Sequence, residues 1–288
     1  MDTRQYMVPF DQSFELASAP TSPNDPVPSE KKLEKKLDKL NDELYELQRK
    51  LYAQDRYAIL LVFQAMDAAG KDSTIRRVMR GVNPAGCQVF SFKQPSTLEL
   101  EHDFLWRSAI RLPEKGRIGI FNRSYYEEVL VVRVHPEYLA GQRVDGDPAT
   151  DEFWENRMES INAHEEHLAR NGTRIIKFWL NVSKEEQKQR FLARLQDPRK
   201  NWKFSSSDVR ERGFWQDYMD AYEKMLKATS KPHAPWYAIP ADNKPYARVC
   251  VANIVADTIR SVDPGYPRAA ESEKEKFHKM ERLLMSET

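Results

Sequence analysis

The sequence predicts an α/β fold in which one five-stranded parallel sheet is covered by helices on both faces. Five short apolar runs are candidate strands, at 58–64, 88–92, 117–121, 174–181 and 236–240. Segments with helical periodicity separate them, at 71–82, 97–110, 151–170, 184–195, 209–227 and 245–262. Strands that alternate with helices form parallel sheets, because each helix returns the chain to the same edge. A ligand is then expected at the carboxyl ends of the strands.

The two ends of the chain have patterns of their own. Residues 1–29 form an N-terminal arm whose second half, S-A-P-T-S-P-N-D-P-V-P-S, is too rich in proline to continue a helix or a central strand. We expect this arm to wrap the surface of the main body, residues 30–267. Residues 268–288, rich in Glu, Lys and Met, predict a C-terminal helical tail with a frayed end.

The segment 30–52 predicts a long helix with one leucine seam. Its apolar positions alternate by four and three residues, at Leu33, Leu37, Leu40, Leu44, Leu47 and Leu51. Such a seam suits a coiled-coil dimer or a helix packed on its own core. Because three heptads are the minimum for a free coiled coil, the sequence favours the packed helix.

Composition limits the classes of protein to consider. The chain has 288 residues, 40% hydrophobic and 31% charged, and its formal net charge of +1 argues against nucleic-acid binding over the whole surface. Cys87 and Cys250 lie in no disulfide or metal-binding pattern, and the N-terminus lacks the basic and apolar segments of a secretion signal. We therefore expect a soluble cytoplasmic protein with neither a nucleic-acid partner nor a membrane partner.

The junction after the first strand, Q-A-M-D-A-A-G-K-D-S-T-I-R, predicts a phosphate-binding loop. Small residues and Gly70-Lys71 lead into a helix, so consecutive backbone N–H groups and a lysine face an anion. Compared with G-x-x-x-x-G-K followed by Ser or Thr, Ala65 replaces the first glycine and Asp72 replaces the hydroxyl residue. The candidate phosphate ligands are Lys71, Ala68, Ala69, Gly70, Asp72, Ser73 and Thr74. The alternative is an ordinary strand-to-helix turn with a solvated lysine.

A carboxylate, Asp67, lies inside this loop. Phosphates repel a carboxylate unless a cation lies between them, so Asp67 implies either Mg²⁺ or a role in positioning an acceptor.

A second set of candidates follows the third strand, in I-F-N-R-S-Y-Y-E-E-V-L-V-V-R-V. In phosphate-binding α/β proteins this strand commonly ends in an acid that holds Mg²⁺ or its water, whereas here it ends in Asn122. An amide brings no charge, which transfers more of the cation binding to Asp67 and to Glu127 or Glu128. Arg123 and Arg133 are suited to bidentate contacts with phosphate oxygens, and the alternative for each is a salt bridge to a neighbouring acid.

Residues 184–212 are strongly basic and predict a movable lid over the phosphate site. Arg190 and Arg194 are four residues apart and share a helix face, and Asp197-Pro198 then breaks the helix before Lys200 and Lys203. Phosphoryl transfer needs cations that stabilise charge on the equatorial oxygens, which such a lid supplies. A solvated charged helix would have the same pattern. By contrast, H-E-E-H at 164–167 lacks the spacing of a zinc site and predicts a solvated helix face.

Three segments together resemble the family-2 polyphosphate kinases: A-M-D-A-A-G-K-D-S-T-I, then F-N-R-S-Y-Y-E-E-V-L-V-V-R-V-H, then the basic lid with W-Y-A-I-P-A-D-N-K. The resemblance covers residues 30–262. It implies a P-loop kinase-like three-layer sandwich with an N-terminal helical extension and a helical lid. It also implies reversible transfer of the terminal phosphate of inorganic polyphosphate to AMP and ADP, or to GMP and GDP, with Mg²⁺ or Mn²⁺. We further expect a homo-oligomer.

Carried over by position, the resemblance assigns the loop aspartate to Asp67, the loop lysine to Lys71, the end of the third strand to Asn122 and the next arginine to Arg123. The lid arginines correspond to Arg190 and Arg194. The expected metal ligands are Asp67 and Asn122. Many members have Asp at the position of Asn122, and N-R-S-x-Y-E resembles the subgroup that accepts both nucleoside mono- and diphosphates.

Two other functions stay open at this stage. One is a nucleotide kinase that uses ATP on the same fold, although no segment identifies a purine pocket. The other is a non-catalytic protein that binds polyphosphate or a nucleotide without turnover. Asn122 and the missing hydroxyl at position 72 keep this second alternative open.

Overall fold

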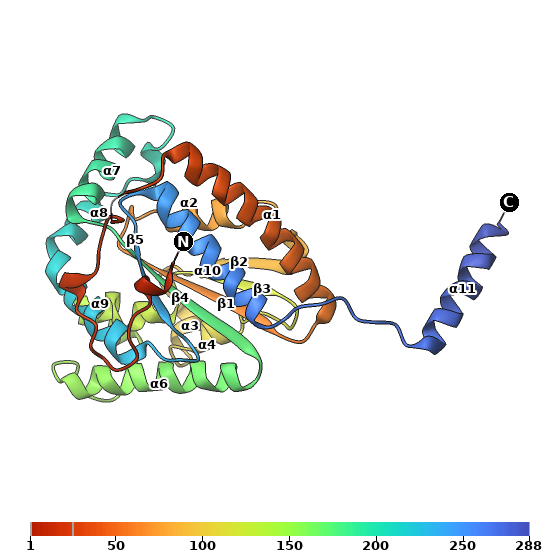
Figure 1. Ribbon diagram of the computed structural model, residues 1–288. Coiled ribbons are helices and arrows are strands. Elements are labelled where there is room, and N and C mark those ends of the chain that lie inside the picture. The colour runs from red at the N-terminus through yellow and green to blue at the C-terminus, as the bar shows by residue number, and fades with distance from the viewer. Residues whose placement is uncertain (1, 25, 288) are drawn as a thin grey trace.

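A parallel sheet forms the centre of the protein (Figure 1). The computed structural model describes residues 2–24 and 26–287, apart from the side chain of Lys203. The strands are β1 (Ala58–Gln64), β2 (Cys87–Ser91), β3 (Ile118–Asn122), β4 (Thr173–Asn181) and β5 (Trp236–Pro240). Their order is β2-β3-β1-β4-β5, and every neighbouring pair is parallel. The five predicted strands and the α/β class are therefore confirmed.

The strand order places β1 in the middle of the sheet. The chain builds first toward one edge, with β2 and β3, and then toward the other, with β4 and β5. The direction thus reverses beside β1, and the carboxyl end of β1 lies where ligands bind in open α/β sheets.

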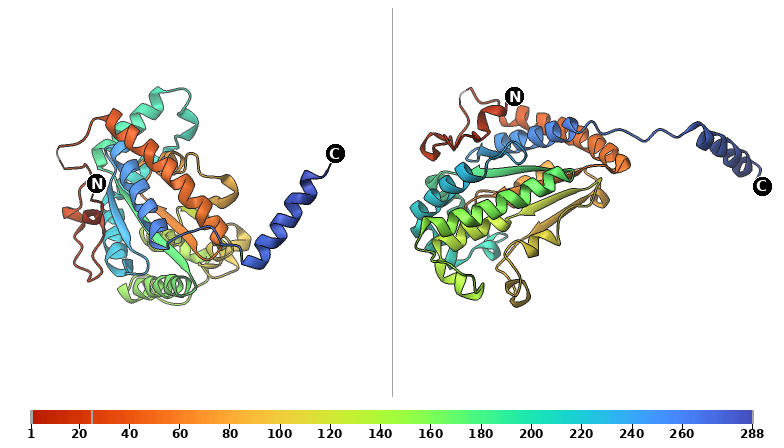
Figure 2. Two further views of the ribbon diagram at one scale, coloured as in Figure 1. Left: turned by 45° about the vertical axis from the view of Figure 1, so that its right-hand side comes forward. Right: turned by 90° about the horizontal axis from the view of Figure 1, so that it is seen from below.

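Helices cover both faces of the sheet and give the protein three layers (Figure 2). One face carries α10 (Lys244–Ser261), which packs on α1 (Glu30–Gln54) and α2 (Lys71–Val78). The other face carries α6 (Asp151–Arg170), which packs on β4 and on α9 (Trp215–Thr229). The remaining helices are η1 (Arg4–Tyr6), η2 (Leu16–Ser18), η3 (Pro84–Gly86), α3 (Thr97–Leu100), α4 (Trp106–Ala109), η4 (Tyr125–Val129), α5 (Val131–Val134), η5 (Pro136–Gly141), α7 (Lys184–Gln196), η6 (Asn201–Lys203), α8 (Ser206–Glu211), η7 (Arg212–Phe214) and α11 (Glu271–Met285).

The leucine seam of α1 is part of the core of this chain. Leu33, Leu37, Leu40, Leu44 and Leu51 are all buried, and α1 packs along α10. The helix packed on its own core, which the sequence favoured over a coiled coil, is therefore confirmed.

The predicted helix 71–82 ends earlier, at Val78, and two other predicted helices are each divided in two. The segment 97–110 forms α3 and α4 instead of one helix, because Asp103 accepts a hydrogen bond from the amide of Leu105 and so competes with helix continuation. The segment 209–227 is divided between α8 and α9 by the turn η7, which contains Gly213. The short helices η4, α5 and η5 were not predicted, since each is too short to show a helical period.

The N-terminal arm packs along the outer edge of β5. The amide of Val8 donates to the carbonyl of Trp236 (2.9 Å), and further on the Asn181 side chain donates to the carbonyl of Ala19 (3.1 Å). The ring of Phe14 lies edge-on to Trp179. The arm thereby covers a strand edge that would otherwise expose unpaired backbone groups. At the other end of the chain, α11 stands apart from the body (Figures 1 and 2). No described helix is both long and apolar enough to traverse a lipid bilayer.

Candidate active site

The β1–α2 loop, residues 65–70, joins the central strand to α2 at the carboxyl edge of the sheet. Gly70 has a φ of +107°, a conformation that side chains with a Cβ rarely adopt, and Ala68 also lies in the left-handed region at +60°. These two residues allow the chain to curl directly into α2. The first amides of a helix have no intrahelical acceptor and are available to an anion.

Side chains from outside the loop bind its carbonyl groups. Lys71 Nζ donates to the carbonyl of Ala65 (2.6 Å), and Gln187 Nε2 donates to that of Asp67 (2.8 Å). Arg190 Nη1 donates to the carbonyls of Ala68 (3.1 Å) and Ala69 (2.7 Å). Because N–H and C=O point in opposite directions across a trans peptide, the held carbonyls of Asp67 and Ala69 leave the amides of Ala68 and Gly70 facing the other way. The amide of Ala69 donates instead to the carbonyl of Met66 (3.3 Å). The loop is therefore arranged as an anion cradle.

Lys71 and Arg190 are buried beneath this loop, at 9% and 6% exposure. Burial lowers the pKa of Lys71, and the nearby positive charge of Arg123 lowers it further. An anion in the cradle would supply this desolvated ammonium group with an opposite charge. Arg190, predicted as a lid arginine, also donates to the carbonyls of Ala241 (2.6 Å) and Asp242 (3.1 Å), so it ties the loop to the end of β5 instead of pointing into a cleft.

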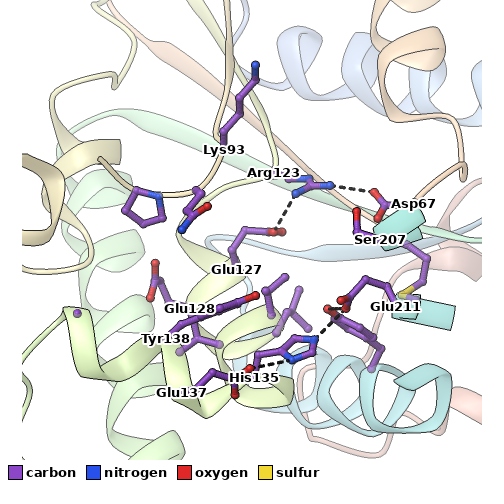
Figure 3. A pocket seen from close by; sticks show the side chains of 18 of the residues that line it. Asp67, Lys93, Arg123, Glu127, Glu128, His135, Glu137, Tyr138, Ser207 and Glu211 are labelled. Carbon is purple, nitrogen blue, oxygen red and sulfur yellow. Dashed lines mark hydrogen bonds and ion pairs between the residues drawn. The ribbon is translucent and has the colours of Figure 1, made fainter. Parts of the chain in front are cut away.

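Asp67, Arg123 and Glu127 form a charged cluster beside the loop (Figure 3). Arg123 Nη2 donates to Asp67 Oδ1 (2.8 Å), and its Nη1 lies 3.7 Å from Glu127 Oε2. The carboxylate of Glu127, followed by that of Asp67, raises the pKa of Arg123. More than a third of the Arg123 and Asp67 side chains is exposed, so both are accessible to a ligand. Asp67, Arg123 and Glu127 were all predicted from the sequence as site residues, and the structure brings them together.

Asn122 lies with other partners. Its Nδ2 donates to Asp72 Oδ1 (2.6 Å) and reaches Ser91 Oγ (3.4 Å). The Asn122 amide therefore binds Asp72 and Ser91 in this structure, and the shared metal ion of Asn122 and Asp67 stays a prediction. Ser73 Oγ donates to the carbonyl of Gly70 (3.0 Å), and Thr74 is buried.

The basic lid and Arg133 make contacts with acids of this chain. Arg194 lies 3.7 Å from Asp208, and Lys200 lies 2.8 Å from Asp197. Arg133 Nη2 donates to Asp151 Oδ1 (2.9 Å) and does not line the pocket, which matches the salt-bridge alternative for this residue. The side chain of Lys203 lies outside the described part of the chain.

A pocket of about 630 Å³ opens beside the charged cluster (Figure 3). Several of its lining residues were not predicted from the sequence: Lys93, Arg107, His135, Asp208, Glu211, Tyr218 and Tyr222. His135 Nε2 lies 2.9 Å from Glu211 Oε2, which also accepts from Tyr218 (2.7 Å). This contact closes α8 of the lid onto the segment after β3. His135 lies close to the predicted site residues in the sequence, but its partner Glu211 is 76 residues away. Local spacing therefore could not predict this contact.

Asp67, Glu127 and Asp208 line the pocket, and their carboxylates are suited to a divalent cation that is also bound to phosphate. Burial and the neighbouring carboxylate of Asp67 raise the pKa of Asp208, so negative charges are crowded there. Among the described residues no group of three or more His, Cys, Asp and Glu is arranged to hold a metal ion. A divalent cation in this pocket would therefore need phosphate oxygens beside one or two carboxylates, which is the usual ligand set of Mg²⁺ at nucleotide sites.

A central strand, a glycine loop, a buried lysine at a helix N-terminus and an adjacent arginine define a P-loop kinase-like phosphotransferase. The family Polyphosphate kinase 2 (PPK2) matches residues 28–266. The chain belongs to this family, as the sequence resemblance predicted.

Several relatives are similar to this chain in sequence and in fold. An ADP-polyphosphate phosphotransferase of Rhodopseudomonas palustris is 50% identical over 284 residues, which is 98% of each chain. An AMP/ADP-polyphosphate phosphotransferase of Meiothermus ruber is 45% identical over 229 residues, 80% of this chain and 82% of the other. The crystal structure of Polyphosphate Kinase 2 from Arthrobacter aurescens superimposes with a TM-score of 0.84 at 37% identity and covers 93% of both chains. The P-loop kinase-like fold is confirmed.

Proposed function

We propose that this protein transfers the terminal phosphate of inorganic polyphosphate to nucleoside mono- and diphosphates, reversibly and with Mg²⁺ or Mn²⁺. Its relatives named above act on AMP or ADP and polyphosphate, and the AMP/ADP relative supports the wider acceptor range. The observation that carries the proposal is the position of Arg123 between the anion cradle and a pocket of about 630 Å³. A pocket of this size has room for a nucleotide next to the cradle.

In this proposal the residues of the chain bind and neutralise phosphate. Lys71 and the amides at the start of α2 hold one phosphate group. Arg123 leaves Asp67 to contact the equatorial oxygens, where charge accumulates during transfer. Asp67, with Glu127 or Asp208, is available to a divalent cation, which would neutralise the repulsion between two phosphate chains. The hydrogen bond between Asn122 and Asp72 holds the start of α2 against the end of β3.

The two alternatives from the sequence are less well supported. The relatives named above are polyphosphate phosphotransferases, which does not favour a kinase that transfers phosphate from ATP to AMP without polyphosphate. The same names, which describe transfer and not binding alone, do not favour a non-catalytic binding protein either. We also propose a cytoplasmic location, since both cysteines are free thiols, and a homo-oligomer.

The decisive experiment supplies long-chain polyphosphate and Mg²⁺ with AMP, ADP or GDP and measures the products by ion-pair chromatography. We expect ADP and ATP to form from AMP, and no product to form when EDTA removes the cation. Lys71→Ala should abolish product formation, whereas Lys224→Met, an exposed lysine on α9, should not. Efficient transfer from ATP to AMP without polyphosphate would favour the ATP-dependent alternative, and binding without any product would favour the non-catalytic one.

A further inference from the structure

A buried charge pair joins the sheet to α6, and neither of its residues lines the pocket. Lys177, in the middle of β4, and Glu165, on α6, are both 0% exposed, and their Nζ and Oε2 atoms are 2.6 Å apart. Lys177 Nζ also donates to the hydroxyl of Tyr126 (2.8 Å) and to the carbonyl of Thr229 (2.7 Å). Glu165 Oε1 accepts from the hydroxyls of Tyr125 (2.8 Å) and Tyr126 (2.9 Å). The predicted solvated face at 164–167 is therefore wrong for Glu165.

This cluster is saturated with hydrogen bonds. The ammonium group of Lys177 has three donors and finds three acceptors, and both oxygens of Glu165 are used. The cost of desolvating both charges offsets much of their attraction, so the pair contributes little net stability. Apolar residues of similar volume often give an equally stable protein. The cluster thus provides fixed geometry more than it provides net stability.

The geometry that it fixes is that of the turn carrying Arg123 and Glu127. Tyr125 and Tyr126 lie between these two residues in the sequence, and their hydroxyls are anchored on Glu165. Arg123 itself has a φ of +62°, and Ser124 accepts hydrogen bonds from Gln64 Nε2 (3.2 Å) and the Tyr126 amide (3.1 Å). A non-glycine residue stays in this left-handed conformation only where its surroundings hold it.

We propose that Glu165 and Lys177 are positioning residues for Arg123 and Glu127, acting through the hydroxyls of Tyr125 and Tyr126. This proposal rests on the proposed function. None of the four cluster residues lines the pocket, so their effect on transfer passes through the turn. Phosphoryl transfer depends on placing charged groups accurately, and a displacement of about 1 Å can lower the rate about 10²-fold. Losing the anchor would let the Arg123 guanidinium leave its place beside Asp67.

The most informative variant is Tyr125→Phe/Tyr126→Phe, which removes only the two hydroxyls and keeps the rings. Glu165→Gln is the direct variant, but it also leaves Lys177 without its charge partner in the core. The matched control is Tyr6→Phe, which removes one hydroxyl of a buried tyrosine pair (Tyr6 and Tyr246, 2.8 Å) away from the turn. We expect the double variant to lower kcat about tenfold with KM within about twofold, since chemistry and not binding is affected. Tyr6→Phe should leave kcat unchanged.

A second arm separates positioning from a general loss of structure. In an Arg123→Ala background the same double substitution should lower kcat less than twofold, because the group that it positions is gone. An equal, multiplicative loss in both backgrounds would overturn the proposal, and so would an unchanged kcat in the double variant.

A spectroscopic readout makes the test independent of turnover. In ¹H–¹⁵N spectra of arginine side chains, the Arg123 Nε signal, assigned by its loss in Arg123→Ala, should shift or broaden in Tyr125→Phe/Tyr126→Phe and stay in place in Tyr6→Phe. An unmoved Arg123 signal would overturn positioning even if the enzyme were active. An inactive wild-type protein whose Arg123 signal still moves would overturn the proposed function and leave the positioning intact.

Discussion

Two charged pairs contact the turn that follows β3. Asp67 and Arg123 meet at 2.8 Å with 36% and 39% of their side chains exposed, whereas Glu165 and Lys177 meet at 2.6 Å with none exposed. The distances are nearly equal, yet the surroundings differ. The open pair is solvated and free to exchange partners with a ligand, and the closed pair is fixed by three further groups. Burial and hydrogen-bond saturation, and not the ion-pair distance, therefore distinguish a reactive pair from a positioning pair.

The largest effect should come from removing one charge of the buried pair, Glu165 and Lys177. Lys177→Met leaves Glu165 as an uncompensated buried charge, and we expect it to lower the free energy of unfolding by up to about 5 kcal/mol. Urea denaturation measures this change. The control is Lys224→Met, which removes an exposed lysine paired with Asp151 at 2.9 Å and should change stability by less than about 1 kcal/mol. If both variants lost the same free energy of unfolding, burial would not distinguish the two kinds of ion pair.

In the exposed pair, Asp67 and Arg123, a substitution should affect catalysis strongly and stability only slightly. Arg123→Ala is expected to lower kcat on the order of 10³-fold, because the charge that stabilises the transferring phosphoryl group is lost. Its free energy of unfolding should change by less than about 1 kcal/mol, since an exposed ion pair contributes little. Steady-state kinetics with polyphosphate and ADP, together with urea denaturation, test both statements. Arg260→Ala changes an exposed arginine on α10 that pairs with Glu43 on α1, and it should leave kcat unaltered.

An intermediate effect is expected at the brace of the β1–α2 loop. Arg190→Met removes donors to the carbonyls of Ala68 and Ala69, so we expect the cradle to loosen and kcat to fall about 10²-fold. Lys188→Met alters an exposed lysine on the same helix and serves as the control. A loss confined to KM would instead indicate that Arg190 acts only in binding.

The smallest expected effect is on the pH dependence of stability, and it concerns the tyrosines that bind the buried pair. Burial raises the pKa of Tyr125 and Tyr126 well above 10, so the stability that they contribute is full below pH 10 and is lost as the pH rises further. Burial lowers the pKa of Lys177 to about 8, which acts in the opposite direction between about pH 8 and 10.5. We expect the urea midpoint of Tyr125→Phe/Tyr126→Phe to fall less steeply above pH 10 than that of the wild type. A Tyr45→Phe control, at an exposed tyrosine, should retain the wild-type slope.

Particular residues show how far the sequence predicted the site. Asp67 and Lys71 were predictable because they lie within a few residues of one strand end, and local spacing alone brings them to the loop. The contacts of Arg190 could not be predicted because its partners, at 68–69 and 241–242, are far from it in sequence. The burial of Glu165 was missed for the same reason: a charged residue is read as solvated unless its partner on another element is known. His135 and Glu211 meet only when the lid is folded.

By itself, the sequence determined the order of strands and helices, the glycine loop after β1 and the candidate residues on it. These features depend on hydrophobic periodicity and on the conformations available to a few consecutive residues, which act over short stretches of chain. The tertiary structure alone decided which charges are open to the pocket and which are sealed in the core. That choice depends on desolvation and on partners supplied by distant elements, and no local pattern encodes either.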